Sequence, residues 1–239
     1  MKARITARSL LAGLAILAAS AAGTGAMAQS NPPTKIVFQL NFAPGGYHAG
    51  FPMALARGYY KEAGLDVTIE PGNGSAVTAQ LVAAGKVDIA YADAAPVMRL
   101  ISSGARMKIL STIFQGNPNQ VTALKKTGLK SVADLKGRSI GMPSSGSQPS
   151  MFPLVMAANG LKEGDVKIVN MPGDALVAAL MQGTVDTIAG SIDSYGLTLK
   201  SLGAETTNFL FIDHGTATVS TSIIASDAIL AQKPEVVKA

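Results

Sequence analysis

Short apolar runs alternate along this chain with longer segments in which apolar residues recur at helical spacing. The apolar runs predict buried strands at 36–40, 66–70, 88–91, 108–114, 138–142, 166–170, 187–189, 209–212 and 220–225. The intervening segments predict helices at 49–62, 76–84, 94–102, 132–135, 151–159, 174–182, 193–202 and from 227 onward. Repeated alternation of strand and helix is typical of mostly parallel sheets flanked by helices. We therefore expect an α/β fold.

Part of this pattern occurs twice. Three motifs recur at a near-constant offset of about 100 positions: 66–69 with 165–168, 71–72 with 172–173, and 85–88 with 183–186. Two copies are too few for a stacked repeat array, which needs about three or more. The repeat instead predicts two similar lobes, and small ligands commonly bind in the cleft where two lobes meet.

The N-terminal segment has the pattern of an export signal. Lys2, Arg4 and Arg8 precede an uncharged apolar run at 10–22, and a small-x-small cleavage pattern follows at 26–28. The alternative is a membrane-spanning helix, but this run is shorter than the roughly 20 apolar residues that a span requires. We expect residues 1–28 to be removed, and the mature protein to reside in the periplasm without a stable membrane anchor.

The two lobes are expected to exchange segments of the chain. We assign residues 29–123 together with 215–239 to lobe one, because strand 220–225 is expected to return to it, and residues 124–214 to lobe two. Residues 234–239 read as the opening of a helix without a stop signal. We therefore expect the sequence to be truncated at its C-terminus.

Composition excludes several functions. The chain has no cysteine, which excludes disulfides, thiolate metal sites, a cysteine nucleophile and a lipid-anchored cysteine. Its formal charge of +5 is raised by the basic start of the export segment, so we expect no nucleic-acid partner. His48 and His214 are its two histidines and lie far apart, so we expect no metal centre. There is no Gly-x-Ser-x-Gly elbow, although a serine–histidine–acid triad remains open.

The candidate binding residues follow the carboxyl ends of strands, where ligands gather in open parallel sheets. Phe42 and Tyr47 can stack on a flat ring, while Asn41 and His48 can hydrogen-bond to it. The structural alternative is that Phe42 fills the core and His48 caps the next helix. We expect the first interpretation.

Other candidates come from both lobes. Ser144, Ser145 and Ser147 can bind an anion or a polar ligand edge through hydroxyls and backbone N–H groups, unless the loop is simply a solvated turn. Glu70 and Asp93 can accept hydrogen bonds from a ligand amino group. The remaining candidates occupy the same strand ends: Asn73, Ser75, Gln115, Asp193 and Tyr195. Asp88 and Asp186, which precede strands, are expected to stabilise turns away from the cleft.

Several motifs together resemble a known family. The segments 58–67, 85–88, 134–141 and 226–235 look like those of thiamine-pyrimidine-synthase-like and alkanesulfonate-type substrate-binding proteins of ABC transporters. The resemblance covers nearly all of the chain after residue 28. It implies a two-lobed type II periplasmic binding fold, a small-molecule ligand, an ABC permease as partner and a monomeric protein.

The same family includes an enzyme that makes the thiamine pyrimidine with iron and a lysine-bound pyridoxal phosphate. The matching lysine and histidine positions hold Ala92 and Pro96 here, and the cysteine motif is missing. We therefore expect a binding protein without a cofactor, for a heterocyclic or anionic ligand such as a thiamine pyrimidine precursor. The alternatives are a synthase-like enzyme, a sulfonate or taurine binder, or a sensor without transport.

Overall fold

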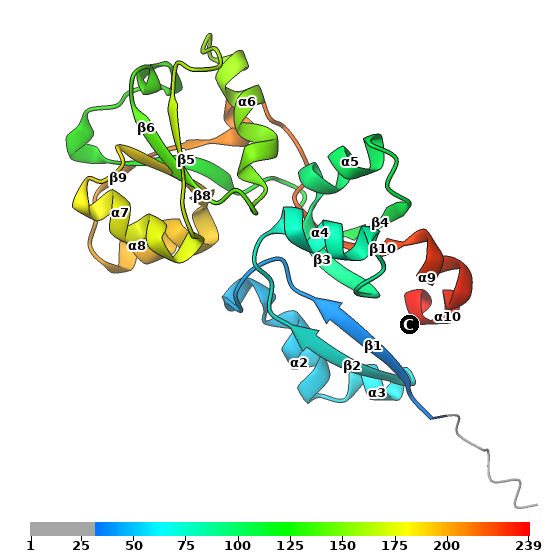
Figure 1. The fold of residues 1–239 in the computed structure, drawn as a ribbon. Coiled ribbons are helices and arrows are strands. Elements are labelled where there is room, and N and C mark those ends of the chain that lie inside the picture. Colours follow the sequence, from blue (N-terminus) through cyan, green and yellow to red (C-terminus); the bar gives the residue numbers. More distant parts are fainter. Residues whose placement is uncertain (1–31) are drawn as a thin grey trace, which may run out of the picture. The chain divides into compact units, whose positions relative to one another are not determined.

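The computed structural model describes residues 32–239, and residues 33–239 form one compact unit. The expected signal peptide at 1–28 lies outside the described residues. Two five-stranded sheets, each with flanking helices, make up the unit (Figure 1). Below, each sheet together with its helices is called a lobe.

The first sheet has the strand order β2-β1-β3-β10-β4. Its strands are β1 (Thr34–Gln39), β2 (Leu65–Glu70), β3 (Ile89–Asp93), β4 (Met107–Thr112) and β10 (Thr221–Ser226). The associated helices are η1 (Gly46–His48), α2 (Gly50–Ala56), α3 (Tyr59–Glu62), α4 (Ser75–Ala83), α5 (Ala94–Ser102), α9 (Asp227–Gln232) and α10 (Pro234–Lys238). Strands β1, β2 and β3 pair in parallel, and β10 runs antiparallel to β3 and β4.

The second sheet has the order β7-β6-β8-β5-β9. Its strands are β5 (Asn119–Leu124), β6 (Ser139–Met142), β7 (Lys167–Asn170), β8 (Thr187–Ser191) and β9 (Thr206–Leu210). Its helices are η2 (Lys125–Thr127), η3 (Val132–Leu135), α6 (Gln148–Ala158), η4 (Gly173–Ala175), α7 (Leu176–Gln182), the π-helix η5 (Ile192–Gly196), α8 (Leu197–Ser201) and η6 (Phe211–His214). Here β5 is antiparallel to β8 and β9.

The two sheets are built alike, strand for strand. In both, three parallel strands are followed by one antiparallel strand and an edge strand, which confirms the expected α/β fold with mostly parallel sheets. The repeated aspartates occupy matching places. Asp88 accepts a 3.1 Å hydrogen bond from the backbone N–H of Val37, and Asp186 accepts a 2.8 Å bond from that of Ser139. Asp186 therefore holds the start of β6, whereas Asp88 holds the middle of β1.

Two expectations differ from the structure. Strand β5 was not expected, and it pairs in the second sheet, so a lobe boundary after residue 123 would divide this strand from its sheet. The chain crosses between the sheets at 113–118 and again at 211–220. The helix expected at 49–62 is split into α2 and α3, because Gly58 adopts a left-handed conformation with φ of 79°.

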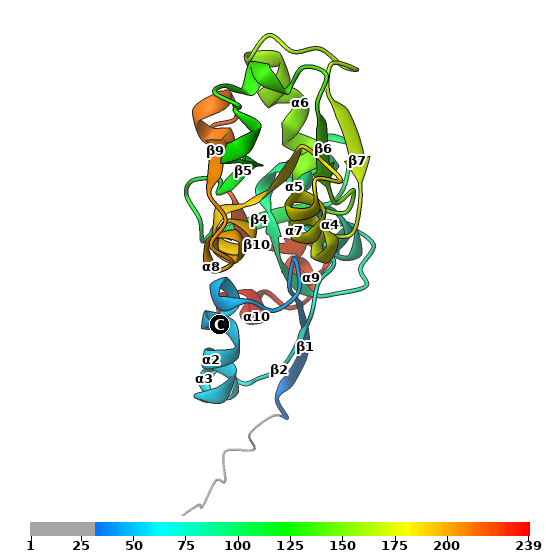
Figure 2. The same ribbon diagram turned by 90° about the vertical axis from the view of Figure 1, so that its left-hand side faces the viewer.

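Apolar clusters fill the space between each sheet and its helices. In the second lobe, Phe152 of α6 and Phe211 of η6 are fully buried against β5 and β6. In the first lobe, Ile229 of α9 and Val236 of α10 pack with Phe38 of β1, so the C-terminal helices lie beside the N-terminal strand (Figures 1 and 2). Within residues 32–239, no helix has the length and apolar character needed to cross a membrane.

Candidate functional site

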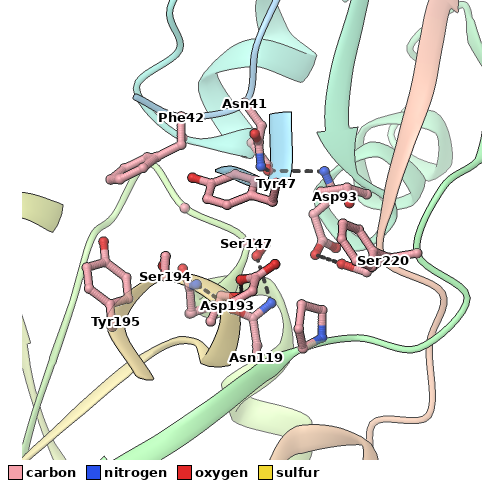
Figure 3. Close-up of a pocket in the computed structure, with 18 of the residues that line it drawn as sticks. Asn41, Phe42, Tyr47, Asp93, Asn119, Ser147, Asp193, Ser194, Tyr195 and Ser220 are labelled. Atoms are coloured by element: carbon pink, nitrogen blue, oxygen red, sulfur yellow. Dashed lines mark hydrogen bonds between the residues drawn. The ribbon is translucent and has the colours of Figure 1, made fainter. Parts of the chain in front are cut away.

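A cavity lies between the two lobes at the carboxyl ends of β1, β3 and β8. Its volume is about 610 Å³ including the space open to solvent. Figure 3 shows that Phe42, Tyr47 and Asp93 of the first lobe face Asp193 and Tyr195 of the second. The other lining residues are Asn41, Gly74, Ser75, Phe114, Pro118, Asn119, Pro143, Gly146, Ser147, Gln148, Ser191, Ser194, Ser220 and Thr221.

Asn41, directly after β1, is held by His48. The Nε2 atom of His48 lies 2.8 Å from Asn41 Oδ1, while the backbone N–H of Gly45 donates to His48 Nδ1 at 3.2 Å. Since Nδ1 accepts, the ring proton is on Nε2 and is donated to Asn41. Burial lowers the pKa of His48 to about 4, so the ring is neutral near pH 7. The Asn41 amide therefore presents its NH₂ group toward Ser75.

Ser75 begins α4 and accepts hydrogen bonds from residues at the carboxyl ends of β1 and β3. Its Oγ accepts from the backbone N–H of Asp93 at 3.0 Å and from Asn41 Nδ2 at 3.4 Å. Because these bonds use the oxygen lone pairs, the hydroxyl proton is directed to another acceptor. Ser75 lines the cavity, so that proton is available to a ligand.

Asp93 joins the site to both crossing segments. It ends β3 and caps α5 by accepting from the N–H of Ala95 at 3.0 Å. Its Oδ2 accepts from Asn117 Nδ2 at 3.2 Å and from Ser220 Oγ at 3.0 Å, and these two residues lie on the first and second crossing segments. Burial raises the pKa of Asp93, and the hydrogen bonds of Ala95, Ser220 and Asn117 oppose that shift.

A chain of amide side chains continues this network into the second lobe. Asn117 Oδ1 accepts from the backbone N–H and side-chain Nδ2 of Asn119 at 2.9 and 2.8 Å. Asn119 in turn donates to Ser147 Oγ at 3.2 Å and accepts from Gln148 Nε2 at 2.6 Å. The Gln148 side chain is 7 % exposed, and its Oε1 has no hydrogen-bond partner among the described residues. That oxygen is itself buried and lies against Gly146.

Aromatic rings from both lobes enclose the cavity. Phe42 and Tyr195 meet edge to face with ring centroids 6.5 Å apart (Figure 3). Burial, with a smaller contribution from the Asp193 carboxylate, raises the pKa of Tyr47 to about 12. Burial also raises the pKa of Tyr195. Both phenols are therefore neutral at physiological pH, and they offer ring faces as well as hydroxyl groups.

The lobes also touch through their backbones beside the cavity. The N–H of Ala76, in the first turn of α4, donates to the carbonyl of Ser145 at 3.0 Å, so a carbonyl of one lobe caps a helix of the other. A Cβ atom on Gly74 would overlap the Ser145 carbonyl. Glycine thus permits this close approach.

The structure brings most of the candidate residues together. Asn41, Phe42, Tyr47, Ser75, Asp93, Ser147, Asp193 and Tyr195 line the cavity. Six lie outside its wall: His48 is buried behind Asn41, Glu70, Asn73 and Gln115 are exposed, Ser144 borders a second cavity, and Ser145 makes the contact between lobes. Whether the lining residues bind a ligand stays a prediction.

Sequence analysis did not select several lining residues. Asn119 begins β5, which was not expected, although a β-prone run after Pro118 was a usable signal. Ser220 and Thr221 lie at the start of the return strand. A second, mainly apolar cavity lies at Met142, Ser144, Pro149, Phe152, Pro153, Ile168 and Asn170 in the second lobe.

The two similar sheets, the double crossover and the cavity between them define a protein of the substrate-binding type found in periplasmic binding proteins. The chain belongs to the NMT1/THI5-like family, whose model matches residues 46–239.

Two named relatives cover most of this chain. A Haemophilus influenzae protein assigned by name to thiamine biosynthesis is 29 % identical over 70 % of this chain and 53 % of its own length. The riboflavin-binding protein RibY of Chloroflexus aurantiacus is 28 % identical, over 100 % of this chain and 71 % of the relative. The chain thus spans about half the length of the Haemophilus relative.

A solved structure supports the fold alone. The periplasmic aliphatic sulphonate-binding protein SsuA of Escherichia coli superposes with a TM-score of 0.68 at 16 % identity, covering 86 % of this chain and 69 % of the other.

Proposed function

We propose that this chain is the exported solute-binding protein of an ABC importer, and that it binds a small flat heterocycle between its lobes. The observation that carries the proposal is the cavity whose polar and aromatic walls come from both sheets. A ligand that contacts both lobes at once favours the closed arrangement over the open one. The closed protein then presents itself to the permease in the periplasm.

The wall chemistry supports a heterocycle. Phe42, Tyr47 and Tyr195 supply ring faces, while Asn41 and Ser75 supply donors at fixed positions. The name of the Chloroflexus relative, riboflavin-binding protein, fits a flat ring system as ligand. A sulfonate or carboxylate is disfavoured because Asp93 and Asp193 line the cavity, and the lining residues, all within the described part of the chain, include no lysine or arginine.

The Haemophilus relative, named for thiamine biosynthesis, keeps a synthase as the second candidate. Ala92 and Pro96 stand where the related enzyme has its lysine and histidine, which supports binding without chemistry. An absorption band between 330 and 420 nm that stays with the protein after free pyridoxal phosphate is removed, together with pyrimidine formation in the presence of iron, would establish the enzyme instead.

The test is a thermal-shift screen of the chain from Gln29 onward. Thiamine pyrimidines, riboflavin, taurine and aromatic carboxylates are compared at equal concentration. A ligand at 100 times its dissociation constant adds about 2.7 kcal/mol to the free energy of unfolding. We expect a shift with at least one heterocycle and none with taurine. Absence of a shift with every heterocycle would contradict the proposal.

A further inference from the structure

The described residues that line the cavity include two acids, Asp93 and Asp193, and no lysine or arginine. Asp93 projects from the end of β3 and Asp193 from the first turn of η5, so each lobe contributes one carboxylate. None of the ion pairs formed within residues 32–239 involves either of them. Burial raises the pKa of Asp93, so the preference for a cation rests on the Asp193 carboxylate, which disfavours an anion in a partly desolvated space.

The rings around the carboxylates strengthen this preference. Phe42 and Tyr47 come from one lobe and Tyr195 from the other, and Figure 3 shows Asp193 beside Tyr195, across the cavity from Phe42 and Tyr47. Aromatic faces carry negative charge density and attract a cation within about 6 Å of the ring centre. Both tyrosines retain their protons near neutral pH, so their rings and hydroxyls stay uncharged partners.

We propose that the ligand is a cationic heterocycle, an inference that rests on the proposed function. Its positive nitrogen lies among Phe42, Tyr47 and Tyr195 and is paired with Asp193. Asn41 and Ser75 donate to a ring nitrogen or carbonyl. The cavity therefore selects among flat rings of similar size by their charge.

Three rings of similar size and different charge test this: 1-methylnicotinamide as cation, nicotinamide as neutral compound and nicotinate as anion. Titration calorimetry on the chain from Gln29 should show the cation binding roughly tenfold more tightly than the neutral amide, since a desolvated cation–π contact contributes about 1–2 kcal/mol. Nicotinate should bind more weakly than either.

Asp193→Asn is the decisive variant because it removes one charge and little volume. It should reduce the affinity for 1-methylnicotinamide to about that for nicotinamide. Asp213→Asn is the matched control: it makes the same change of net charge at an exposed residue outside the cavity and should leave all three affinities unchanged. Circular dichroism checks that both variants are folded.

Two outcomes overturn the inference. One is a cation that binds no more tightly than the neutral amide, including the case in which none of the three binds. The other is an equal loss of cation affinity in Asp193→Asn and Asp213→Asn, which would indicate a general effect of net charge. In either case the proposed function holds if riboflavin or a thiamine pyrimidine still stabilises the chain in the thermal-shift screen. If these heterocycles also give no shift, the proposed function is contradicted.

Discussion

The Nε2 atom of His48 lies 2.8 Å from Asn41 Oδ1, and through this contact a residue outside the cavity orients one that lines it. The backbone N–H of Gly45 fixes the tautomer from the other side of the ring. His48 is 2 % exposed, so its protonation would place a charge in the protein interior. Protonation would also remove the hydrogen bond that His48 Nδ1 accepts from Gly45, although Nε2 would still donate to Asn41.

The first prediction follows from the neutrality of His48. The folded-state pKa of His48 is about 4, below the 6.5 of an unperturbed histidine. As pH falls from above 6.5 the unfolded chain takes up the proton first, so this contribution to stability is complete above pH 6.5 and is lost toward pH 4. The loss amounts to at most about 3 kcal/mol in the free energy of unfolding.

Urea unfolding between pH 4 and 8 measures this loss in the free energy of unfolding. His48→Gln should flatten the pH dependence, whereas His214→Gln, which leaves His48 in place, should retain it. Equal curves for the native chain and His48→Gln would show that His48 is not held neutral by burial.

Removal of the Asn117 amide should destabilise the protein. Asn117 is 1 % exposed and links Asp93 to Asn119 across the first crossing segment. Asn117→Ala would leave buried polar groups of both neighbours short of a partner, at a cost of about 2 kcal/mol. Chemical denaturation measures this cost against Thr198→Ala, an exposed hydroxyl whose loss should be close to neutral. If Asn117→Ala lowers the free energy of unfolding by no more than Thr198→Ala does, the amide side chains do not stabilise the link between the sheets.

The repeated aspartates should matter for stability and not for binding. Asp186 accepts from the N–H and the hydroxyl of Ser139 at 2.8 and 2.7 Å, whereas Asp88 has its one backbone bond to Val37. Asp186→Asn should therefore cost about 1 kcal/mol, and Asp88→Asn less. The N–H of Ser139 is the largest cause that lowers the pKa of Asp186, so its contribution is lost as pH falls through that lowered pKa. Weaker ligand binding in either variant would contradict their placement away from the cavity.

A substitution at Gly173 tests whether Phe42 packs against this glycine when the lobes are closed. A Cβ atom there would come within 2.5 Å of Phe42 Cζ and 2.6 Å of Tyr195 Oη. Tyr195 belongs to the same lobe as Gly173, so its overlap is present with or without ligand, whereas Phe42 belongs to the other lobe. Gly173→Ala should weaken ligand binding roughly tenfold, because the overlap with Phe42, about 1.4 kcal/mol, is met only when the lobes close. The free energy of unfolding without ligand should fall only by the cost of moving the Tyr195 hydroxyl aside. Small-angle scattering with and without ligand measures closure directly.

Gly50→Ala is the control for Gly173→Ala, since a Cβ at Gly50 meets no atom within 4 Å. Full closure and unchanged affinity in Gly173→Ala would show that Phe42 does not pack against Gly173 when ligand is bound.

Local patterns predicted the fold well where a motif recurs. The repeated Gly-x-Val-Asp segments correspond to Asp88 and Asp186, which hold equivalent strands in the two sheets. The strand-end rule found Asn41, Asp93 and Asp193, because the carboxyl ends of parallel strands meet at one edge. These features depend on neighbours close in sequence or on a general rule of parallel sheets.

Other features depend on contacts that no local pattern contains. Asn119 begins the antiparallel strand β5 and Ser220 directly precedes the antiparallel strand β10, each where the chain has just crossed between the lobes, and both have partners distant in sequence. The imidazole of His48 is a common ligand-binding group, but the turn at Gly45 places it behind Asn41. Sequence therefore indicated which loops form the site, and the structure decided which side chains face it.

Hydrogen–deuterium exchange with the heterocycle that gives the largest thermal shift is the most direct test of the central claim, that both lobes enclose one solute. The account predicts slower exchange in the presence of ligand at 41–48 and 74–76 of the first lobe and, together with them, at 145–148 and 191–195 of the second. Protection confined to one lobe, or centred on the second cavity at 142–153 and 168–170, would contradict it.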